Sequence, residues 1–299
     1  MSIFNHKSRI LGIDSRCSAF KKAKSMNKII FLLLSILIIS CNDSTKSEIE
    51  KENIKLSELE TFQSKSLKKN IQYKIILPEN LEIKKDSLSL LVLLDGDDYS
   101  GIAKNLTSLY EFGDKISPTV IISLPSTRES RWTYYTPTKD TTKIEKGFED
   151  LYSSTGKFDE FADFVHNELI PSVEEKYKIN FNQKTIFGHS LGGLGSLSFA
   201  VLRPEIFDNY IAASPSTMYD QHFIFKTIEK KGNLIFNSMF LTAGLNDANG
   251  YRENVEWLKK YLSEHKSENQ KVGMKIYDNE NHSTSGLKSL IDGIEFIGK

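Results

Sequence analysis

The stretch Lys184–Leu202 reads KTIFGHSLGGLGSLSFAVL and carries the strongest indication of the fold. Its first four residues are typical of a short buried strand, and its last eight are small or apolar residues typical of a packed helix. Between them, Gly188 to Gly192 match Gly-x-Ser-x-Gly. Strand, motif and helix in this order predict a tight turn that exposes the hydroxyl of Ser190 as a nucleophile. Both glycines are needed because a side chain there would collide with the neighbouring strand and helix.

Apolar runs alternate with amphipathic stretches from about Ser64 onward, which predicts an α/β fold with a mostly parallel central sheet flanked by helices. The predicted strands are Ile71–Leu77, Leu88–Leu94, Thr119–Leu124, Lys184–Phe187, Tyr210–Ala213, Ser238–Thr242 and Lys271–Tyr277. The predicted helices are Lys157–Tyr177, Gly250–His265 and Thr284–Ile297, and Pro171 is expected to kink or break the first of them. Residues 63–299 are therefore expected to form one catalytic domain.

The first 40 residues are expected to be a leader rather than part of that domain. Ile29–Ser40 is an unbroken apolar run with the length of a signal-peptide core, and Ile38-Ile39-Ser40-Cys41 resembles the lipobox of bacterial lipoproteins. The sequence thus predicts lipidation of Cys41; the alternatives are a short membrane anchor and a simple signal peptide with a chance cysteine. Translation from Met26 instead of Met1 would give a more typical start.

Residues 41–62 are polar and are expected to form a flexible tether. Removal of the leader, with its seven basic residues and one acidic residue, turns a neutral chain into one with a net charge of −6. This charge gives no indication of a nucleic-acid partner. The expected membrane contact is the N-terminal lipid alone, and Asn42 after the cysteine favours the outer membrane of a bacterial envelope.

The base that activates Ser190 must be a histidine later in the chain, because in folds built on this turn the acid and then the histidine follow the serine. His282 follows the last predicted strand in a polar loop and is the preferred candidate. His265 lies at the polar end of a predicted helix, which is typical of a solvated residue. His222 stands in a segment without a clear pattern and can line the pocket.

Asp247 is the preferred orienting acid, because it follows a predicted strand in the loop Gly244-Leu245-Asn246-Asp247. A helix cap or a turn would equally favour aspartate there. Asp278 is the rival, only four residues from His282.

Two backbone N–H groups should stabilise the oxyanion of an acyl-transfer reaction. One is expected from Leu191, next to the nucleophile, and the other from Asp97, because Gly96 lets the chain turn toward the serine. Asp95, Asp97 and Asp98 could instead form a solvated turn or a metal cluster, but no further ligand spacing supports a metal. No cofactor is expected.

At this point the chain resembles a known family, the putative esterase or esterase D group of α/β-hydrolases, which includes enterochelin-type siderophore esterases. The matching segments are LLVLLDGDDY (Leu90–Tyr99), TYYTPT (Thr133–Thr138), FADFVHNELIPSVEEKYKI (Phe161–Ile179), GHSLGG (Gly188–Gly193), RPEIFDNYIAASPS (Arg203–Ser216), GLND (Gly244–Asp247) and ENHSTS (Glu280–Ser285). The resemblance implies an α/β-hydrolase fold, a Ser190–Asp247–His282 triad and an oxyanion hole from Asp97 and Leu191.

The segments expected to border the substrate depart from the family pattern. Tyr134 stands where an aspartate is common, and Thr217-Met218-Tyr219 replaces the usual tryptophans. Arg131 matches a family arginine. Arg131, Trp132, Tyr134 and His189 are therefore the candidate substrate-binding residues; ordinary packing is the alternative for the aromatic ones.

These features predict a serine carboxylic-ester hydrolase acting through an acyl-enzyme on a small-molecule or glycan-linked ester, such as a siderophore, feruloyl or acetyl-sugar ester. An acyltransferase would use the same triad with an alcohol as acceptor. A non-catalytic ligand-binding lipoprotein is the alternative from another class, and a peptidase is disfavoured by the resemblance.

Overall fold

An eight-stranded sheet in the order β1-β2-β4-β3-β5-β6-β7-β8 organises the computed structural model, which describes residues 58–79, 81, 87–139, 149–248 and 250–298. These residues belong to one unit that extends from Leu56 onward. The strands are β1 Glu60–Ser64, β2 Lys69–Ile76, β3 Ser89–Leu94, β4 Thr119–Leu124, β5 Gln183–His189, β6 Asn209–Ala213, β7 Ser238–Gly244 and β8 Lys271–Tyr277.

Most of the sheet is parallel, as the sequence predicts. β3 pairs in parallel with β4 and β5, and β5 to β8 continue in parallel, whereas β1 and β2 are antiparallel. The run Leu90–Leu94 is apolar at every position because both faces of the sheet are covered: Leu90, Val92 and Leu94 belong to one core cluster, and Leu91 and Leu93 belong to the other.

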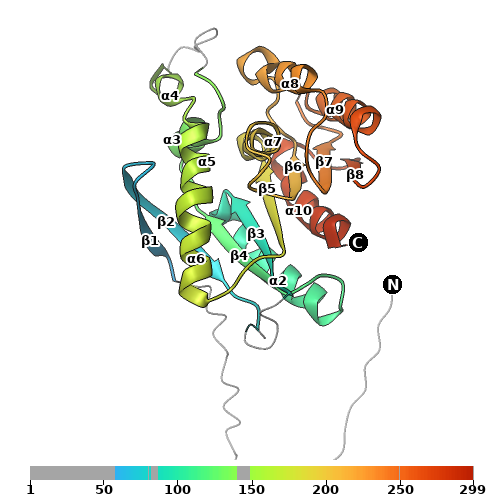
Figure 1. Cartoon of the computed structure of the whole chain (residues 1–299). Coiled ribbons are helices and arrows are strands. Elements are labelled where there is room, and N and C mark those ends of the chain that lie inside the picture. Colours follow the sequence, from blue (N-terminus) through green and yellow to red (C-terminus); the bar gives the residue numbers. More distant parts are fainter. Residues whose placement is uncertain (1–57, 80, 82–86, 140–148, 249, 299) are drawn as a thin grey trace, which may run out of the picture. The chain divides into compact units, whose positions relative to one another are not determined.

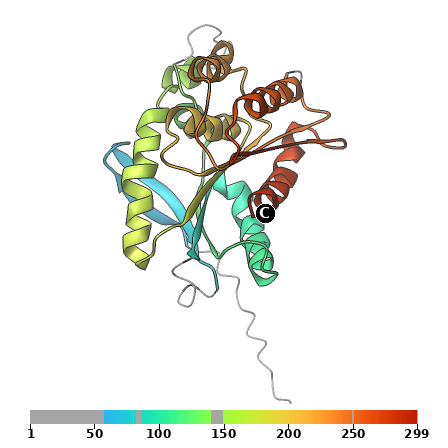
Figure 2. The same ribbon diagram turned by 45° about the vertical axis from the view of Figure 1, so that its right-hand side comes forward.

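Helices lie on both faces of the sheet (Figure 1). α2 (Gly96–Phe112) and α10 (His282–Gly298) lie side by side on one face, as Figure 2 shows. The other face carries α7 (Leu191–Leu202), α9 (Tyr251–His265) and a long helical stretch made of α5 (Phe158–Asp163), the π-helix η2 (Phe164–Leu169) and α6 (Ile170–Tyr177). The remaining helices are α3 (Arg128–Tyr134), α4 (Glu149–Ser154) and α8 (Tyr219–Lys231).

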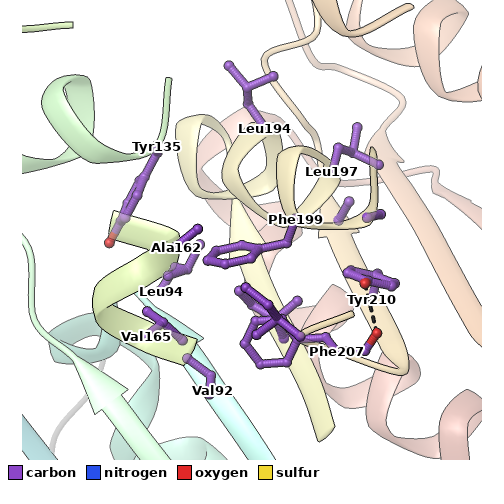
Figure 3. Packing of buried hydrophobic residues seen from close by; sticks show 14 of the residues in the cluster. Val92, Leu94, Tyr135, Ala162, Val165, Leu194, Leu197, Phe199, Phe207 and Tyr210 are labelled. Carbon is purple, nitrogen blue, oxygen red and sulfur yellow. Dashed lines mark hydrogen bonds between the residues drawn. The ribbon is translucent and has the colours of Figure 1, made fainter. Parts of the chain in front are cut away.

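The larger core cluster lies between the sheet and this second layer (Figure 3). Phe199 of α7 is fully buried there, with its ring 4.8 Å from that of Phe158 and 5.1 Å from that of Phe207. The Tyr210 hydroxyl donates a hydrogen bond to the Phe207 carbonyl at 2.8 Å, which satisfies a polar group in this apolar setting. This packing fixes α7, whose N-terminus follows Ser190.

Three sequence predictions need correction. β1 begins at Glu60, so the last residues of the predicted tether 41–62 belong to a strand paired with β2. Asp97 and Asp98 lie in the first turn of the helix α2 and not in the solvated turn that the sequence also allowed. Pro171 does not break the long helix; it is accommodated in the first turn of α6, after the π-helical segment. A π-helical turn suits this place because Pro171 lacks the N–H that an α-helix needs at that position.

The predicted leader 1–40, Cys41 and most of the tether lie outside the described residues. Within the described part of the chain, no helix has both the length and the apolar character that crossing a membrane requires. The same residues contain no group of three or more His, Cys, Asp or Glu side chains arranged to hold a metal ion.

Candidate active site

The turn between β5 and α7 holds Ser190 in an unusual backbone conformation. Its φ is 60° and its ψ is −118°, and its N–H donates a hydrogen bond to the Ala213 carbonyl at 2.9 Å. Gly188 is required because a Cβ there would lie 2.0 Å from the Gly192 carbonyl oxygen. This close approach lets strand and helix meet at a strained residue, which is the geometry that the motif predicts.

His282 lies beside the Ser190 hydroxyl, with Nε2 2.9 Å from Oγ. The sequence places it in a loop, but the structure makes it the first residue of α10. Asn281 explains the earlier helix start, because its side-chain oxygen accepts hydrogen bonds from the N–H groups of Ser283 and Thr284 at 3.0 and 3.3 Å. The helix therefore holds His282, the predicted base, at its N-terminus.

The other two candidate histidines lie elsewhere. His222 is exposed on α8 with its ring 5.6 Å from that of Phe225. His265 ends α9 with its ring 4.0 Å from that of Tyr261. Only His282 of the three is hydrogen-bonded to Ser190.

Asp247 faces the far side of the His282 ring, with Oδ1 3.7 Å from Nδ1. That distance exceeds a hydrogen bond, and neither atom has another hydrogen-bond partner in the described part of the chain. The other oxygen, Oδ2, accepts hydrogen bonds from the Ser214 hydroxyl at 2.7 Å and the Gly244 N–H at 3.1 Å.

Those contacts decide the charge of Asp247. Burial alone would raise the pKa of Asp247, but His282, the Ser214 hydroxyl and the Gly244 N–H outweigh it, so the pKa lies below its usual value. Asp247 is therefore an anion at neutral pH. Its rival, Asp278, lines a separate surface depression with Lys275 and Asp292.

The two predicted oxyanion donors lie at helix starts. Leu191 is the first residue of α7 and Asp97 the second of α2, and the N–H groups in a first helical turn have no acceptor within the helix. α2 and α7 follow the neighbouring strands β3 and β5, and Asp97 lines the same cleft, of about 420 Å³, as Ser190 and His282. The Asp97 carboxylate accepts a hydrogen bond from the Ser126 N–H at 3.2 Å, which ties this turn to the next loop.

Arg131 also lines this cleft, but its hydrogen bonds go to protein groups that lie beside the site. Its Nε donates to Asp95 Oδ1 at 2.9 Å, and an Nη donates to the His189 carbonyl at 3.2 Å. Asp95 is buried, has a φ of 56° and precedes α2 directly. Burial raises the pKa of Asp95, whereas Arg131 and Ser126 favour its charged form. Arg131 thus holds the turn that carries Asp97.

His189 lies beneath His282. Its Nε2 is 2.7 Å from the His282 carbonyl oxygen, so this nitrogen carries the proton and donates. Burial and the neighbouring His282 lower the pKa of His189 to about 4. The side chain is therefore neutral at pH 7 and supports the start of α10.

The structure does not bring the other two candidate substrate-binding residues into the cleft. Tyr134 is buried, with its ring stacked 5.7 Å from that of Phe161 and Lys69 Nζ 4.6 Å from its centre. Trp132 packs its ring 5.2 Å from that of Tyr152. The prediction for Tyr134 is corrected to packing, because its segment folds as the helix α3, capped by Thr127 and Ser130. Trp132 is partly exposed on the same helix, and its role in substrate binding stays a prediction.

Two polar residues near Ser190 were not predicted from the sequence. Ser216 Oγ lies 3.4 Å from Ser190 Oγ, and Tyr251 Oη lies 3.3 Å from Ser216 Oγ. The Tyr251 ring is 4.3 Å from the His282 ring. Tyr251 carries no motif, so only its place at the start of α9 after Asp247 could have indicated it.

A sheet of this order with a serine, a histidine and an aspartate at the carboxyl ends of its strands defines a hydrolase-type α/β protein. The family described as "Putative esterase" matches residues 64–289, so the chain belongs to that family, as the sequence resemblance predicts.

Curated relatives match over shorter stretches. The ferri-bacillibactin esterase BesA of Bacillus subtilis (strain 168) is 40% identical over 90 residues, which cover 28% of this chain and 31% of that protein. The apo-salmochelin esterase of Escherichia coli O6:H1 (strain CFT073) is 27% identical over 134 residues, or 42% of this chain and 41% of that one. These matches thus span less than half of either relative; together with the family they support the prediction of an ester hydrolase.

Solved structures share the fold. The BES protein from Bacillus cereus superposes with a TM-score of 0.71 at 24% identity, covering 81% of this chain and 96% of that one. An IroE-like serine hydrolase from Shewanella oneidensis gives a TM-score of 0.70 at 24% identity, covering 80% of this chain and 79% of the other. The α/β-hydrolase fold predicted from the sequence is confirmed.

Proposed function

We propose that this chain is a serine carboxylic-ester hydrolase in which Ser190, His282 and Asp247 act through an acyl-enzyme. The observation that carries the proposal is the 2.9 Å contact between Ser190 Oγ and His282 Nε2 at a strained turn, with a buried carboxylate behind the imidazole. Asp247 completes the set once its oxygen approaches Nδ1 within hydrogen-bond distance, and catalytic hydrogen bonds are often longer before substrate binds.

The proposed reaction has two steps. His282 takes the Ser190 hydroxyl proton as Oγ bonds to the ester carbonyl carbon, and the oxyanion accepts hydrogen bonds from the Leu191 and Asp97 N–H groups. The carbonyl re-forms as the C–O bond to the alcohol breaks, and His282 gives its proton to the leaving oxygen. Water then repeats the sequence on the acyl-enzyme and releases the acid.

A siderophore ester is the first substrate class to test. Its support is that curated relatives are named as esterases of ferri-bacillibactin and apo-salmochelin. Feruloyl and acetyl-sugar esters are the next classes, because Thr217-Met218-Tyr219 stands where siderophore-type relatives usually have tryptophans.

The decisive experiment measures hydrolysis by the purified protein beside Ser190→Ala. The panel contains p-nitrophenyl acetate and butyrate, methyl ferulate, acetylated xylan and a catecholate trilactone. We expect turnover that falls by a factor on the order of 10⁴ or more in the variant. Full activity in folded Ser190→Ala would refute the proposal. Ester formation when an alcohol is added would identify an acyltransferase, and ligand binding without turnover would identify a binding protein.

We further propose that Cys41 is lipidated and holds the protein at the bacterial envelope, with the outer membrane favoured by Asn42. The support is the order of apolar run, small residue and cysteine in the sequence. Metabolic labelling with an alkyne fatty acid should mark the wild type and leave Cys41→Ala unmarked. Equal labelling of both proteins would contradict the proposal, and membrane fractionation would assign the site.

A further inference from the structure

The proposed base is not fixed by the acid alone. Asp247 Oδ1 is 3.7 Å from His282 Nδ1, too far for a hydrogen bond that would set the angle of the ring. Two other rings contact the imidazole instead: His189 at 4.9 Å and Tyr251 at 4.3 Å between ring centres. His189 also binds the backbone of His282. Tyr251 contacts the side chain only through its ring, so its contribution can be separated.

Tyr251 is held in place by the start of α9. Gly250, with a φ of 96°, precedes the helix, and its N–H donates to Glu253 Oε2 at 3.2 Å, while the Asn254 N–H donates to the Gly250 carbonyl at 3.0 Å. These bonds fix the first turn of the helix. The phenol ring therefore takes its position from the backbone, four residues after Asp247.

The Tyr251 hydroxyl reaches the nucleophile through one further group. It lies 3.3 Å from Ser216 Oγ, which lies 3.4 Å from Ser190 Oγ. Ser216 is buried, and its N–H donates to the Ser190 carbonyl at 3.0 Å, so its hydroxyl is held at a set distance from Ser190. The four side chains of Ser190, His282, Tyr251 and Ser216 thus form a closed ring of contacts.

We propose that Tyr251 is a positioning residue for this site, a conclusion that rests on the proposed function. Its ring sets the orientation of the His282 imidazole, and its hydroxyl, through Ser216, holds the Ser190 hydroxyl toward that base. An aromatic ring beside the imidazole also stabilises the imidazolium that forms when the serine proton is transferred. A change of about 1 Å in such a geometry costs about 100-fold in rate.

The test compares Tyr251→Leu, Tyr251→Phe and the matched control Tyr261→Leu in the full-length protein. Tyr261 stands on the same helix with its ring 4.0 Å from that of His265, so its loss removes a tyrosine–histidine contact away from the cleft. We expect Tyr251→Leu to lower kcat for p-nitrophenyl acetate by about 10- to 100-fold with KM changed less than about 3-fold. Tyr251→Phe should stay within about 5-fold of wild type, and Tyr261→Leu within about 2-fold.

The hydroxyl part of the proposal has its own test. Tyr251→Phe and Ser216→Ala each remove one of the two hydroxyl groups that contact each other. The double variant should therefore have a kcat no lower than that of the less active single variant. Fully additive losses would overturn this part.

A second readout separates this inference from the proposed function. Covalent labelling of Ser190 by a fluorophosphonate needs the nucleophile and the base but no knowledge of the natural ester, and its rate should fall in Tyr251→Leu as kcat does. A folded Tyr251→Leu that is labelled within about 3-fold of the wild-type rate overturns the positioning role and leaves the triad intact. Wild-type Ser190 that is not labelled at all overturns both. Equal losses in Tyr251→Leu and Tyr261→Leu would reveal a general effect on α9 and also refute the role.

Discussion

The two edges of the parallel sheet each border a cavity, and the cavities differ in volume and in the residues that line them. The amino ends of the strands surround a cavity of about 580 Å³ lined mainly by neutral polar residues, among them Ser89, Thr119 and Asn209. The carboxyl ends surround the cleft of about 420 Å³ that holds Ser190. The larger cavity is therefore not the one with a serine hydrogen-bonded to a histidine.

What distinguishes the carboxyl edge is local strain and unmatched polar atoms. Asp95, Ser190 and Ser214 follow β3, β5 and β6, and all three have positive φ angles, of 56°, 60° and 37°. The buried atoms without a hydrogen-bond partner in the described residues include Asp247 Oδ1 and His282 Nδ1, but none from the lining of the amino-edge cavity. Cavity volume therefore does not identify the candidate site. Backbone strain and buried polar atoms without hydrogen-bond partners, both of which cost stability, do identify it.

After Ser190→Ala, the largest expected effect at the carboxyl edge is that of Asp247→Asn. The amide cannot stabilise an imidazolium, so kcat for an ester substrate should fall by a factor on the order of 10⁴. Asp278→Asn, which alters a carboxylate of a separate depression, is the matched control and should keep wild-type kcat. Similar kcat values for the two variants would show that Asp247 is not the acid.

The pH dependence of folding should report the buried His189. Its pKa is about 4 in the folded protein against 6.5 when exposed, so the unfolded chain binds the extra proton first as the pH falls. The stabilisation is complete above pH 6.5 and is lost as the pH falls toward 4. In urea titrations at pH 7 and pH 4, wild type should lose about 3 kcal/mol more than His189→Gln, whose amide can still donate to the His282 carbonyl. Identical losses would mean that His189 titrates normally.

The Asp95–Arg131 pair should contribute to stability at the same edge. Arg131→Met leaves a buried carboxylate without its cation and should lower the free energy of unfolding by about 2 kcal/mol, less than for a fully buried pair because the Arg131 side chain is 29% exposed. The double variant Asp95→Asn/Arg131→Met removes the unpaired charge and should recover part of the loss in urea titrations. A double variant with a lower free energy of unfolding than Arg131→Met would contradict this explanation.

The smallest effect is expected at the amino edge. Asn237→Ala alters an exposed lining residue of the larger cavity and should change kcat/KM less than about 2-fold and the free energy of unfolding by less than about 0.5 kcal/mol. A clear loss of activity would show that the amino-edge cavity takes part in the reaction.

Regular patterns made the fold predictable. The apolar strands and the turn at Ser190 are local features, and each of the seven predicted strands overlaps an observed one. β1 was missed because ETFQS is a polar edge strand, in which only Ser64 is buried. The start of α2 was missed because its aspartates also suit a turn.

The candidate site was only partly predictable from the sequence. Chain order predicted Ser190, Asp247 and His282, which the structure brings together, and their catalytic roles stay predictions. The directions in which other side chains point could not be read from chain order. Tyr134 shows this, because α3 turns its ring onto Phe161 and away from the cleft. Tyr251 shows the converse, since its contact with His282 joins residues that no local pattern connects.

The conformation of Ser190 has a consequence for how such a protein evolves. A φ of 60° with a ψ of −118° suits glycine better than serine, so a glycine there would relieve backbone strain of about 1–3 kcal/mol and remove the proposed nucleophile in the same step. Selection for stability alone would therefore draw this position toward glycine. A requirement for the hydroxyl would oppose that drift, so this substitution would exchange the proposed activity for stability.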